Sequence, residues 1–313
     1  MNLIPGNAQW IGARPEQQDA FGFAGCAAQG ATLPGGVLVV LADGMGGLQE
    51  GRAASQIAVK TMLATYAAQP AATPVPEALD QALQAANRAV HELAQATAGV
   101  GQVGTTLIAA AVRDGRLFWI GVGDSRLYRY RAADHSLTPC NEDHTLANAL
   151  WPQVAAGVLQ ADDIASHPDR DALTSFLGLP AIPQVDGSRR PLRLEAGDRL
   201  LLCSDGVDGV LSREELADPL AGDPQTAAEE LIAMLRMRAL AHQDNATVAL
   251  LACEANGERP TAHTRRIAHR PHPIRRIAVW FIVLLLTGGG IGFGLLWWQG
   301  RTDVPPITLP VPL

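Results

Sequence analysis

One stretch of this sequence limits what the chain can fold into more than any other. Residues 277–298 run for 22 residues without a charged side chain, with Trp280 near one end and Trp297 and Trp298 at the other. A helix of that length spans about 33 Å, enough to cross a hydrocarbon core of about 30 Å, and tryptophans favour membrane interfaces. A buried core helix is the alternative, but soluble helices of this length nearly always carry a polar face. We therefore predict a transmembrane helix at 277–298.

The charges on either side of this helix predict its orientation. Six arginines and no acidic residue lie in residues 259–276, whereas Arg301 and Asp303 on the other side cancel. The positive-inside rule then places residues 1–276 in the cytoplasm and residues 299–313 outside, as a single-pass protein of the inner membrane.

The segments next to the helix show no regular pattern. Residues 254–276, with many Pro, Arg and His, are typical of a basic juxtamembrane linker, and the tail after the helix is short. Gly288 with Gly292, and Gly290 with Gly294, would let two transmembrane helices approach closely. A helix dimer and a plain flexible span both remain open.

The rest of the chain differs from this tail in charge. Residues 1–253 hold 17 Lys and Arg against 28 Asp and Glu, whereas residues 254–313 hold seven against three. An acidic body argues against nucleic acid as a partner, because a phosphate backbone needs a basic surface. The four cysteines form no CxxC motif, and the N-terminus lacks the basic and apolar regions of a signal peptide. Both observations favour a domain in a reducing compartment.

Residues 1–253 show the pattern of one α+β domain. Two of the apolar runs flank Asp114-Gly115, a strong hairpin signal. Because the strands come in hairpins and do not alternate with helices, we expect antiparallel sheets covered by helices. The predicted strands are 37–43, 105–112, 116–123, 125–131, 199–205 and 245–253, and the predicted helices are 50–68, 76–97 and 224–240.

Aspartates recur where these strands begin or end. Carboxylates that project from a rigid scaffold into one cleft repel one another unless cations neutralise them. Sites made of oxygen ligands alone suit Mg²⁺ or Mn²⁺. Any single Asp-Gly pair fits a plain turn, but five aspartates in such positions favour a metal-binding cleft. They are Asp19, Asp43, Asp124, Asp205 and Asp244.

The motifs around these aspartates occur in a definite order. They are Arg14-Pro-Glu-Gln-Gln-Asp19, Asp43-Gly-Met-Gly-Gly47, Gly104-Thr-Thr106, Gly123-Asp-Ser-Arg126, Asp143-His-Thr145, His167-Pro-Asp-Arg170, Ser204-Asp-Gly206 and Asp244-Asn-Ala-Thr247. Over residues 9–250 the chain resembles the metal-dependent PP2C-type (PPM family) Ser/Thr protein phosphatases of bacteria.

The resemblance implies a fold and a pair of metal ions. It implies a β-sandwich of two antiparallel sheets flanked by helix pairs, with two Mn²⁺ or Mg²⁺ in a cleft at one end. Asp43 would bridge both ions, and the Gly44 carbonyl would bind one of them. Asp205 and Asp244 would bind the other.

The resemblance also assigns the remaining site residues. Asp19 would act mostly through metal-bound water, and Asp124 would serve a weaker third metal site with Asp205. Arg14 would hold the substrate phosphate, while a hydroxide that bridges the two ions attacks phosphorus. Arg14 and Asp43 are therefore the predicted catalytic residues.

Some positions depart from the family or stay ambiguous. Position 45 is Met, where eukaryotic members carry a His proposed as general acid, and position 171 is Asp, where Asn is common. Residues 146–166, which we call the flap segment, fall where the family has its mobile flap. Trp151 in this segment either faces substrate or packs against the body. His144 is better explained as a structural histidine than as a phosphate ligand.

The resemblance thus predicts a bacterial signalling enzyme that is anchored in the membrane and hydrolyses phosphoserine and phosphothreonine. Its partners would be phosphoproteins, including a cognate Ser/Thr kinase or the substrates of that kinase. One alternative is a catalytically silent relative that acts as a membrane-tethered scaffold. Another is a SpoIIE-like phosphatase of a partner-switching protein, although the full flap motif after Asp143 argues against it.

Overall fold

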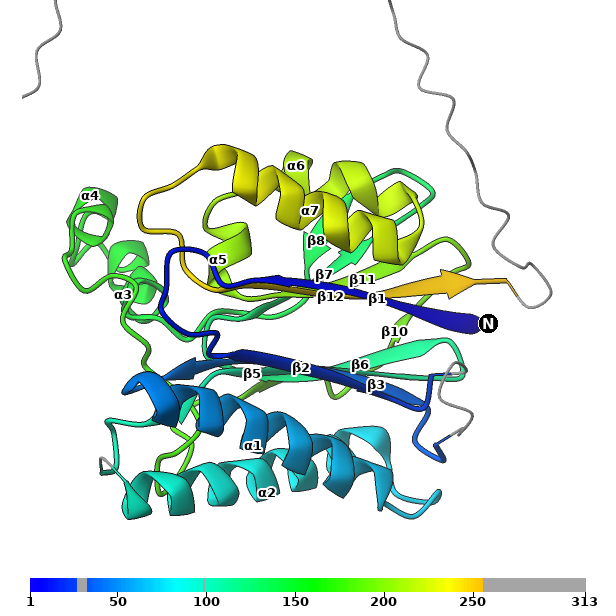
Figure 1. Cartoon of the computed structure of the whole chain (residues 1–313), viewed down its shortest axis with the longest axis horizontal. Coiled ribbons are helices and arrows are strands. Elements are labelled where there is room, and N and C mark those ends of the chain that lie inside the picture. The colour runs from blue at the N-terminus through cyan, green and yellow to red at the C-terminus, as the bar shows by residue number, and fades with distance from the viewer. Residues whose placement is uncertain (27–32, 98, 256–313) are drawn as a thin grey trace, which may run out of the picture. The chain divides into compact units, whose positions relative to one another are not determined.

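The computed structural model describes residues 1–26, 33–97 and 99–255. In these residues two antiparallel sheets lie face to face, and helices cover their outer faces (Figure 1). The strands are β1 Asn2–Trp10, β2 Asp19–Ala24, β3 Val37–Met45, β4 Gly104–Thr105, β5 Leu107–Arg113, β6 Arg116–Val122, β7 Arg126–Tyr130, β8 Leu137–Pro139, β9 Asp186–Gly187, β10 Leu192–Arg193, β11 Arg199–Cys203 and β12 Ala246–Glu254. The helices are α1 Leu48–Ala67, α2 Val75–Ala96, α3 Leu146–Ala155, α4 Ala161–Ala165, α5 Asp205–Asp208, α6 Arg213–Ala217 and α7 Pro224–Arg238, with a 3₁₀ turn at Asp218–Ala221.

The strand order shows how distant parts of the chain meet. One sheet has the order β1-β12-β11-β7-β8, and the other has β10-β6-β5-β3-β2, with β4 beside β3 and β9 beside β6. The first strand pairs with the last, so that Asn2 lies opposite Glu254 and Trp10 opposite Ala246. The expectation of an α+β fold with two antiparallel sheets is confirmed.

The third strand explains why its sequence is apolar without interruption. Val39 and Leu41 face the other sheet, where they pack with residues such as Leu202. Val40 and Ala42 face the helices on the outer side. Because neighbouring side chains of a strand point to opposite faces, a strand that is covered on both sides needs apolar residues at every position.

The helices on the two outer faces are not equivalent. The long helices α1 and α2 pack together on one sheet through buried residues such as Met62 and Leu83. On the other sheet, α7 contributes Leu231 and Leu235, and the short α6 adds Leu216. The resemblance implied a pair of helices on each sheet. On this sheet, the short α6 and the 3₁₀ turn that follows it take the place of a second long helix.

Local sequence signals explain where several elements begin and end. Asp114 and Gly115 both adopt positive φ angles, 52° and 69°, as the turn of the β5–β6 hairpin requires. The Asp223 side chain caps α7 by accepting hydrogen bonds from the next turn's backbone. Ala239, with a left-handed φ of 49°, is the C-cap of α7. The helix therefore ends at Arg238, two residues before the predicted end at residue 240.

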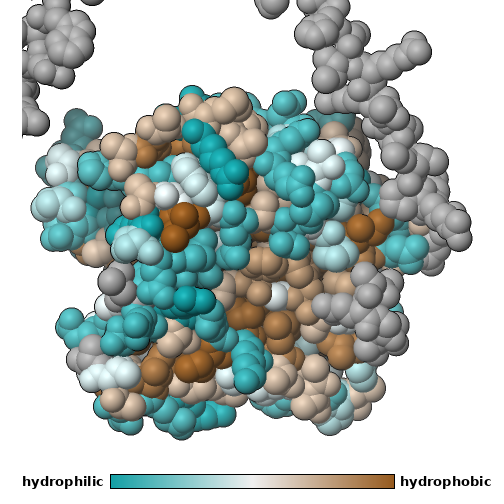
Figure 2. All heavy atoms as spheres, viewed as in Figure 1, coloured by the Kyte–Doolittle hydropathy of each residue, from teal (hydrophilic) through white to brown (hydrophobic). Residues whose placement is uncertain are grey.

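The two longest of the strands that the sequence did not predict, β1 and β2, lie at sheet edges. β1 contains Pro5 and Gly6 and has no strict alternation of apolar and polar residues, and β2 is short. Most of their residues are half-buried. Figure 2 shows tan and brown hydrophobic surface in the middle of this face, where Figure 1 places the two edge strands.

Within the described part of the chain, no helix combines the length and the apolar character that a membrane span needs. The transmembrane helix expected at 277–298 and the tail at 299–313 lie outside the described residues, as does the linker beyond residue 255.

Candidate active site

Both sheets present aspartates at the same end of the sandwich. Cys203, the last residue of β11, pairs with Arg126 at the start of β7 and with Val248 near the start of β12. Three aspartates lie two residues outside these strands: Asp205 after β11, Asp124 before β7 and Asp244 before β12. The antiparallel pairing of the strands therefore brings them together. In the other sheet, Asp43 lies at the matching end of β3.

A cleft of about 320 Å³ opens at this end. Six of the seven predicted site residues are on its surface, namely Arg14, Asp43, Gly44, Asp124, Asp205 and Asp244. The tertiary structure thus brings together residues that are up to 230 positions apart in the sequence. The seventh, Asp19, is not among the lining residues and is buried.

Asp19 is held from one side only. It lies opposite Asp43 in the β2–β3 ladder. Its Oδ2 accepts hydrogen bonds from Ser204 Oγ at 2.8 Å and Thr247 Oγ1 at 2.6 Å, whereas its buried Oδ1 has no hydrogen-bond partner. Burial raises the pKa of Asp19 to about 6, although the two hydroxyl donors oppose this shift. A buried carboxylate oxygen without a donor suits a cation or an ordered water.

The backbone of Asp43 is fixed by two threonines. Its amide donates to Thr106 Oγ1 at 2.9 Å, and its carbonyl accepts from Thr106 N and Thr105 Oγ1, both at 2.8 Å. Burial, followed by the negative charges of Asp19 and Asp205, holds the pKa of the Asp43 carboxyl well above its usual range. The Gly-Thr-Thr motif was recognised in the sequence, but its role in positioning Asp43 was not.

The glycine after Asp43 allows the backbone of α1 to come close. A Cβ atom at Gly44 would lie 2.0 Å from the Gly51 carbonyl oxygen and 2.8 Å from that of Gln18. No other residue fits this position without moving the start of α1.

Two further carboxylates of the cleft, Asp124 and Asp205, also have raised pKa values. Burial and the charge of Asp205 raise the pKa of Asp124 to about 7. Burial and the charge of Asp244 raise the pKa of Asp205. Burial and the neighbouring negative charges thus both disfavour ionisation of these groups, and a divalent cation among them would offset this repulsion.

The donor set fits hard divalent cations. Among the described residues, no three His, Cys, Asp or Glu side chains are arranged so that they could hold a metal ion unaided. Mg²⁺ and Mn²⁺ retain several waters and need few carboxylates each. The carboxylates that raise one another's pKa, together with the partnerless Oδ1 of Asp19, supply oxygen ligands of the right kind.

Arg14 extends over the cleft from the loop before β2. Its NH2 contacts Asp244 Oδ2 at 2.5 Å, and its side chain is 58% exposed. Asn245 shapes this loop, because its Nδ2 donates to the carbonyls of Ile11 and Glu16 and its Oδ1 accepts from Gln18 N at 2.7 Å. This function of Asn245 could not be inferred from its place in the last motif.

The two ambiguous predictions now have structural contexts. His144 Nδ1 lies 3.1 Å from the Gly123 amide, from which it accepts a hydrogen bond, as a structural histidine does. Trp151 lies on α3, which has no buried residue, and it is 49% exposed, so it does not pack into the body. Asp171 and Leu173, which follow the flap segment, line the cleft.

A larger cavity of about 850 Å³ lies at the opposite strand ends. It is bordered by the start of β1 and by the β5–β6 turn, and Asp114 is the one carboxylate among its described lining residues. The smaller acidic cleft is therefore the better candidate for chemistry, although it is less than half as large.

Comparisons with known proteins agree with this geometry. Residues 15–243 match the family model described as Protein phosphatase 2C. The chain is 33% identical over 221 residues to the protein phosphatase PhpP of Streptococcus pneumoniae, a match that covers 70% of this chain and 86% of that protein.

Two solved structures are similar over most of their length. The Mycobacterium tuberculosis serine/threonine phosphatase PstP/Ppp is 30% identical, with a TM-score of 0.66, and the match covers 82% of this chain and 100% of that one. The catalytic domain of a serine/threonine protein phosphatase PstP in complex with two manganese ions is 27% identical, with a TM-score of 0.62 over 81% and 99% of the two chains.

Proposed function

The chain belongs to the protein phosphatase 2C family of metal-dependent enzymes and is a serine/threonine protein phosphatase, and we propose that its acidic cleft binds divalent cations and hydrolyses phosphoserine and phosphothreonine. One observation carries the proposal. Carboxylates from both sheets line one cleft, where partial burial and then their neighbouring charges raise the pKa of Asp43 and Asp124, beside an exposed arginine.

We assign the cation ligands from the residues that meet in the cleft. Asp43 would contact two ions, with the Gly44 carbonyl on one of them and Asp205 and Asp244 on the other. Asp19 would act through ordered water on its open Oδ1. When bound, Mn²⁺ or Mg²⁺ would supply charge that offsets the phosphoryl oxygens and would acidify the water that attacks phosphorus. A weaker third ion at Asp124 and Asp205 is part of the same proposal.

Arg14 would bind and orient the phosphoryl group. Its planar guanidinium matches two phosphate oxygens, and its exposed side chain reaches the cleft from the solvent side. The ion pair with Asp244 keeps the guanidinium beside the cleft before substrate arrives. No histidine is among the described residues that line the cleft, and Met45 occupies part of it, so a water molecule would protonate the leaving serine or threonine oxygen.

We further propose that residues 277–298 anchor the enzyme in the inner membrane, with the phosphatase domain in the cytoplasm. The uncharged length of this segment and the six arginines before it support the proposal. A membrane position would bring the cleft to phosphoproteins near the membrane, among them a Ser/Thr kinase or its substrates.

The test of the chemistry is hydrolysis of a chromogenic aryl phosphate with Mn²⁺, with and without EDTA. We expect activity in Mn²⁺ that EDTA abolishes. Asp43→Asn should lower kcat by more than roughly 100-fold, which is beyond the usual effect of residues that merely support a metal ligand. Asp114→Asn is the matched control, because Asp114 lies in an exposed turn whose positive φ asparagine accepts.

Two results would contradict the proposal. One is a folded wild-type protein with no Mn²⁺-dependent hydrolysis, which would favour the silent scaffold. The other is an Asp43→Asn variant that turns over as fast as Asp114→Asn at the same Mn²⁺ concentration.

A further inference from the structure

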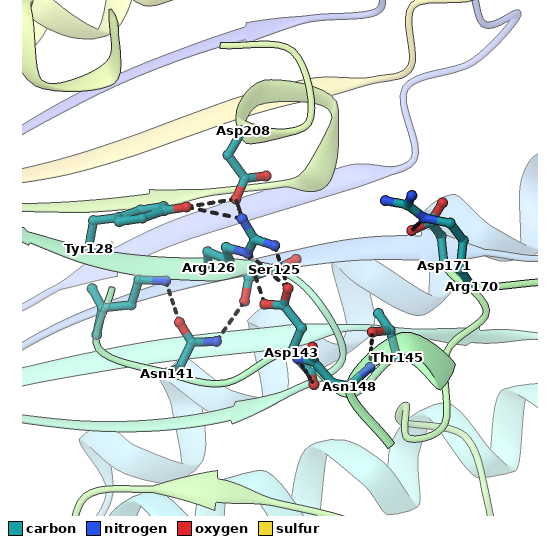
Figure 3. Close-up of polar contacts among 11 residues, drawn as sticks. Ser125, Arg126, Tyr128, Asn141, Asp143, Thr145, Asn148, Arg170, Asp171 and Asp208 are labelled. Carbon is teal, nitrogen blue, oxygen red and sulfur yellow. Dashed lines mark hydrogen bonds and ion pairs between the residues drawn. The ribbon is translucent and has the colours of Figure 1, made fainter. Parts of the chain in front are cut away.

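Arg126 makes more contacts near the cleft than its place in a motif indicates. Its Nε donates to both carboxylate oxygens of Asp143, at 2.9 and 3.0 Å, and its NH2 also contacts Asp143. Its NH1 lies 2.7 Å from Asp208 Oδ2. Figure 3 shows the guanidinium between the two carboxylates. One planar cation therefore joins two separate segments of the chain.

The segment that contains Asp208 also carries a predicted metal ligand, Asp205. Asp208 ends α5, the one-turn helix that begins at Asp205. Residues three apart in a helix lie on the same side, so Asp208 and Asp205 move together. The Asp208 side chain is 4% exposed and also accepts a hydrogen bond from Tyr128 OH at 3.0 Å. Arg126 and Tyr128, both on β7, thus hold the helix of Asp205 in place.

The other segment, which contains Asp143, lies just before the flap segment and the start of α3. The main-chain carbonyl of Asp143 accepts from Asn148 Nδ2 at 2.8 Å, within the first turn of α3. The next residue, His144, donates its amide to the Gly123 carbonyl at 2.9 Å. Figure 1 shows α3 and α4 beyond the ends of the two sheets, at the end where α5 lies. The first two residues of α3 also donate their amides to the carbonyls of Ala172 and Arg170, so residues on both sides of the flap segment hold the start of this helix.

The strand that carries Arg126 is itself well fixed. Ser125 Oγ lies 2.7 Å from Thr106 Oγ1, the hydroxyl that also binds the Asp43 amide. Asn141 accepts from the Leu127 amide at 2.7 Å and donates to the Ser125 carbonyl at 3.1 Å. Arg126 lies on this well-fixed strand. Its ion pairs therefore hold α5 and the residues just before α3 in place relative to the strand.

We propose that Arg126 is a positioning residue that couples the flap segment to the acidic cleft. Through Asp208 it sets the place of Asp205, and through Asp143 it sets the place of the start of α3. The inference rests on the proposed function for its effect on catalysis. Lysine cannot replace it, because an ammonium group lacks the fork that binds Asp143 through two nitrogens while it contacts Asp208.

The chain offers a matched control on the same strand. Arg129 on β7 donates through Nε and NH2 to Asp198, whose side chain is only 3% exposed. This ion pair has the same chemistry as that of Arg126, but Asp198 lies before β11, at the strand ends away from the cleft. Arg129→Gln therefore measures the general effect of removing an ion-paired, half-buried arginine from β7.

The first measurement is amide hydrogen exchange in the full-length, metal-free protein. We expect Arg126→Gln to accelerate exchange in α3 about tenfold or more, the equivalent of one lost charge-assisted hydrogen bond, while α2 and α7 stay at the wild-type rate. Arg126→Lys should have the same local effect, and Arg129→Gln should leave α3 unchanged. Equal acceleration in α2, α3 and α7, or none in α3, would overturn the proposal.

The second measurement is Mn²⁺-dependent turnover of a phosphothreonine peptide. The kcat of Arg126→Lys and Arg126→Gln should fall roughly 10- to 100-fold, with Arg129→Gln near wild type. A kcat for Arg126→Lys within twofold of Arg129→Gln would refute the coupling to the cleft. If Arg126→Gln does not fold, Arg126→Lys decides alone. If the wild-type protein shows no hydrolysis, the proposed function fails, yet the exchange comparison still decides whether Arg126 holds the flap segment.

Discussion

The carboxylates of the cleft destabilise one another in the metal-free protein. Asp19 is buried and Asp124 is half-buried, and mainly this burial raises their pKa values to about 6 and about 7. An unfolded chain would bring both back to ordinary values near 3.8. Each therefore carries a proton in the folded state at a pH where it is ionised in the unfolded state, and this difference links stability to pH.

The linkage predicts how the metal-free protein responds to pH. Between about pH 4 and pH 7 the folded state binds more protons than the unfolded state, so the free energy of unfolding should fall as pH rises through this window. In EDTA we expect a higher Tm at pH 5.5 than at pH 7.5, measured by calorimetry. Saturating Mn²⁺ should raise Tm most at pH 7.5. A Tm in EDTA that rises with pH over this window would contradict the assignment.

Arg14 should affect catalysis and metal binding differently. Loss of a charge-assisted hydrogen bond to phosphate costs about 1.5–3 kcal/mol, so Arg14→Ala should lower kcat/KM roughly 10- to 150-fold. Calorimetric affinity for Mn²⁺ should not fall, because the variant only removes a competitor for Asp244. Arg52→Ala is the control, since Arg52 forms a similarly exposed ion pair with Glu16 outside the cleft. A collapse of Mn²⁺ affinity in Arg14→Ala would make Arg14 structural.

At the scale of elements, α7 depends on its cap and on the sheet that it covers. Asp223 Oδ1 accepts from the amides of Gln225 and Thr226, at 3.1 and 3.0 Å. The helix then buries Leu231 and Leu235 against the sheet. The cap fixes where the helix starts, and therefore which of its residues reach the core.

Removal of this cap should cost stability without touching the chemistry. Asp223→Ala should lower the free energy of unfolding by about 1 kcal/mol, as losses of helix caps do, with kcat unchanged. Urea unfolding followed by circular dichroism measures the change. Asp80→Ala, at an exposed position inside α2, is the control and should stay within about 0.5 kcal/mol of wild type. An equal loss in both variants would show that the cap contributes nothing.

At the scale of the whole molecule, the described contacts end with β12. Glu254 is the last residue paired with β1, and it forms an ion pair with Arg199 at 3.0 Å. The residues of the cleft all precede it. Every described contact that positions the cleft is thus made by residues that precede residue 256.

Truncation should separate the enzyme from its proposed anchor. A protein that ends at Glu258 should be soluble, monomeric and as active on an aryl phosphate as the full-length protein, which should sediment with membranes. A periplasm-dependent reporter at the N-terminus should stay silent, because the six arginines hold that side in the cytoplasm. An active reporter, or a truncated protein that folds but does not turn over, would contradict this organisation.

The sequence by itself determined the features that depend on near neighbours. Continuous apolar runs marked β3 and β11, Asp114-Gly115 marked a hairpin, and the helices predicted at 50–68 and 76–97 match α1 and α2 to within two residues. The motifs around the strand-end aspartates indicated six residues that line one cleft. The strand, hairpin and helix predictions succeeded because periodicity and turn chemistry are properties of short segments.

Only the tertiary structure decided the features that depend on distant partners. β1 becomes a strand through pairing with β12, more than 230 residues away, despite its proline and glycine. Arg14 meets Asp244, and Arg126 joins Asp143 to Asp208, because the sheets bring these positions together. An arginine has the same local pattern whether it faces solvent or bridges two buried carboxylates, since its partners are chosen by the packing of the whole domain rather than by the residues beside it.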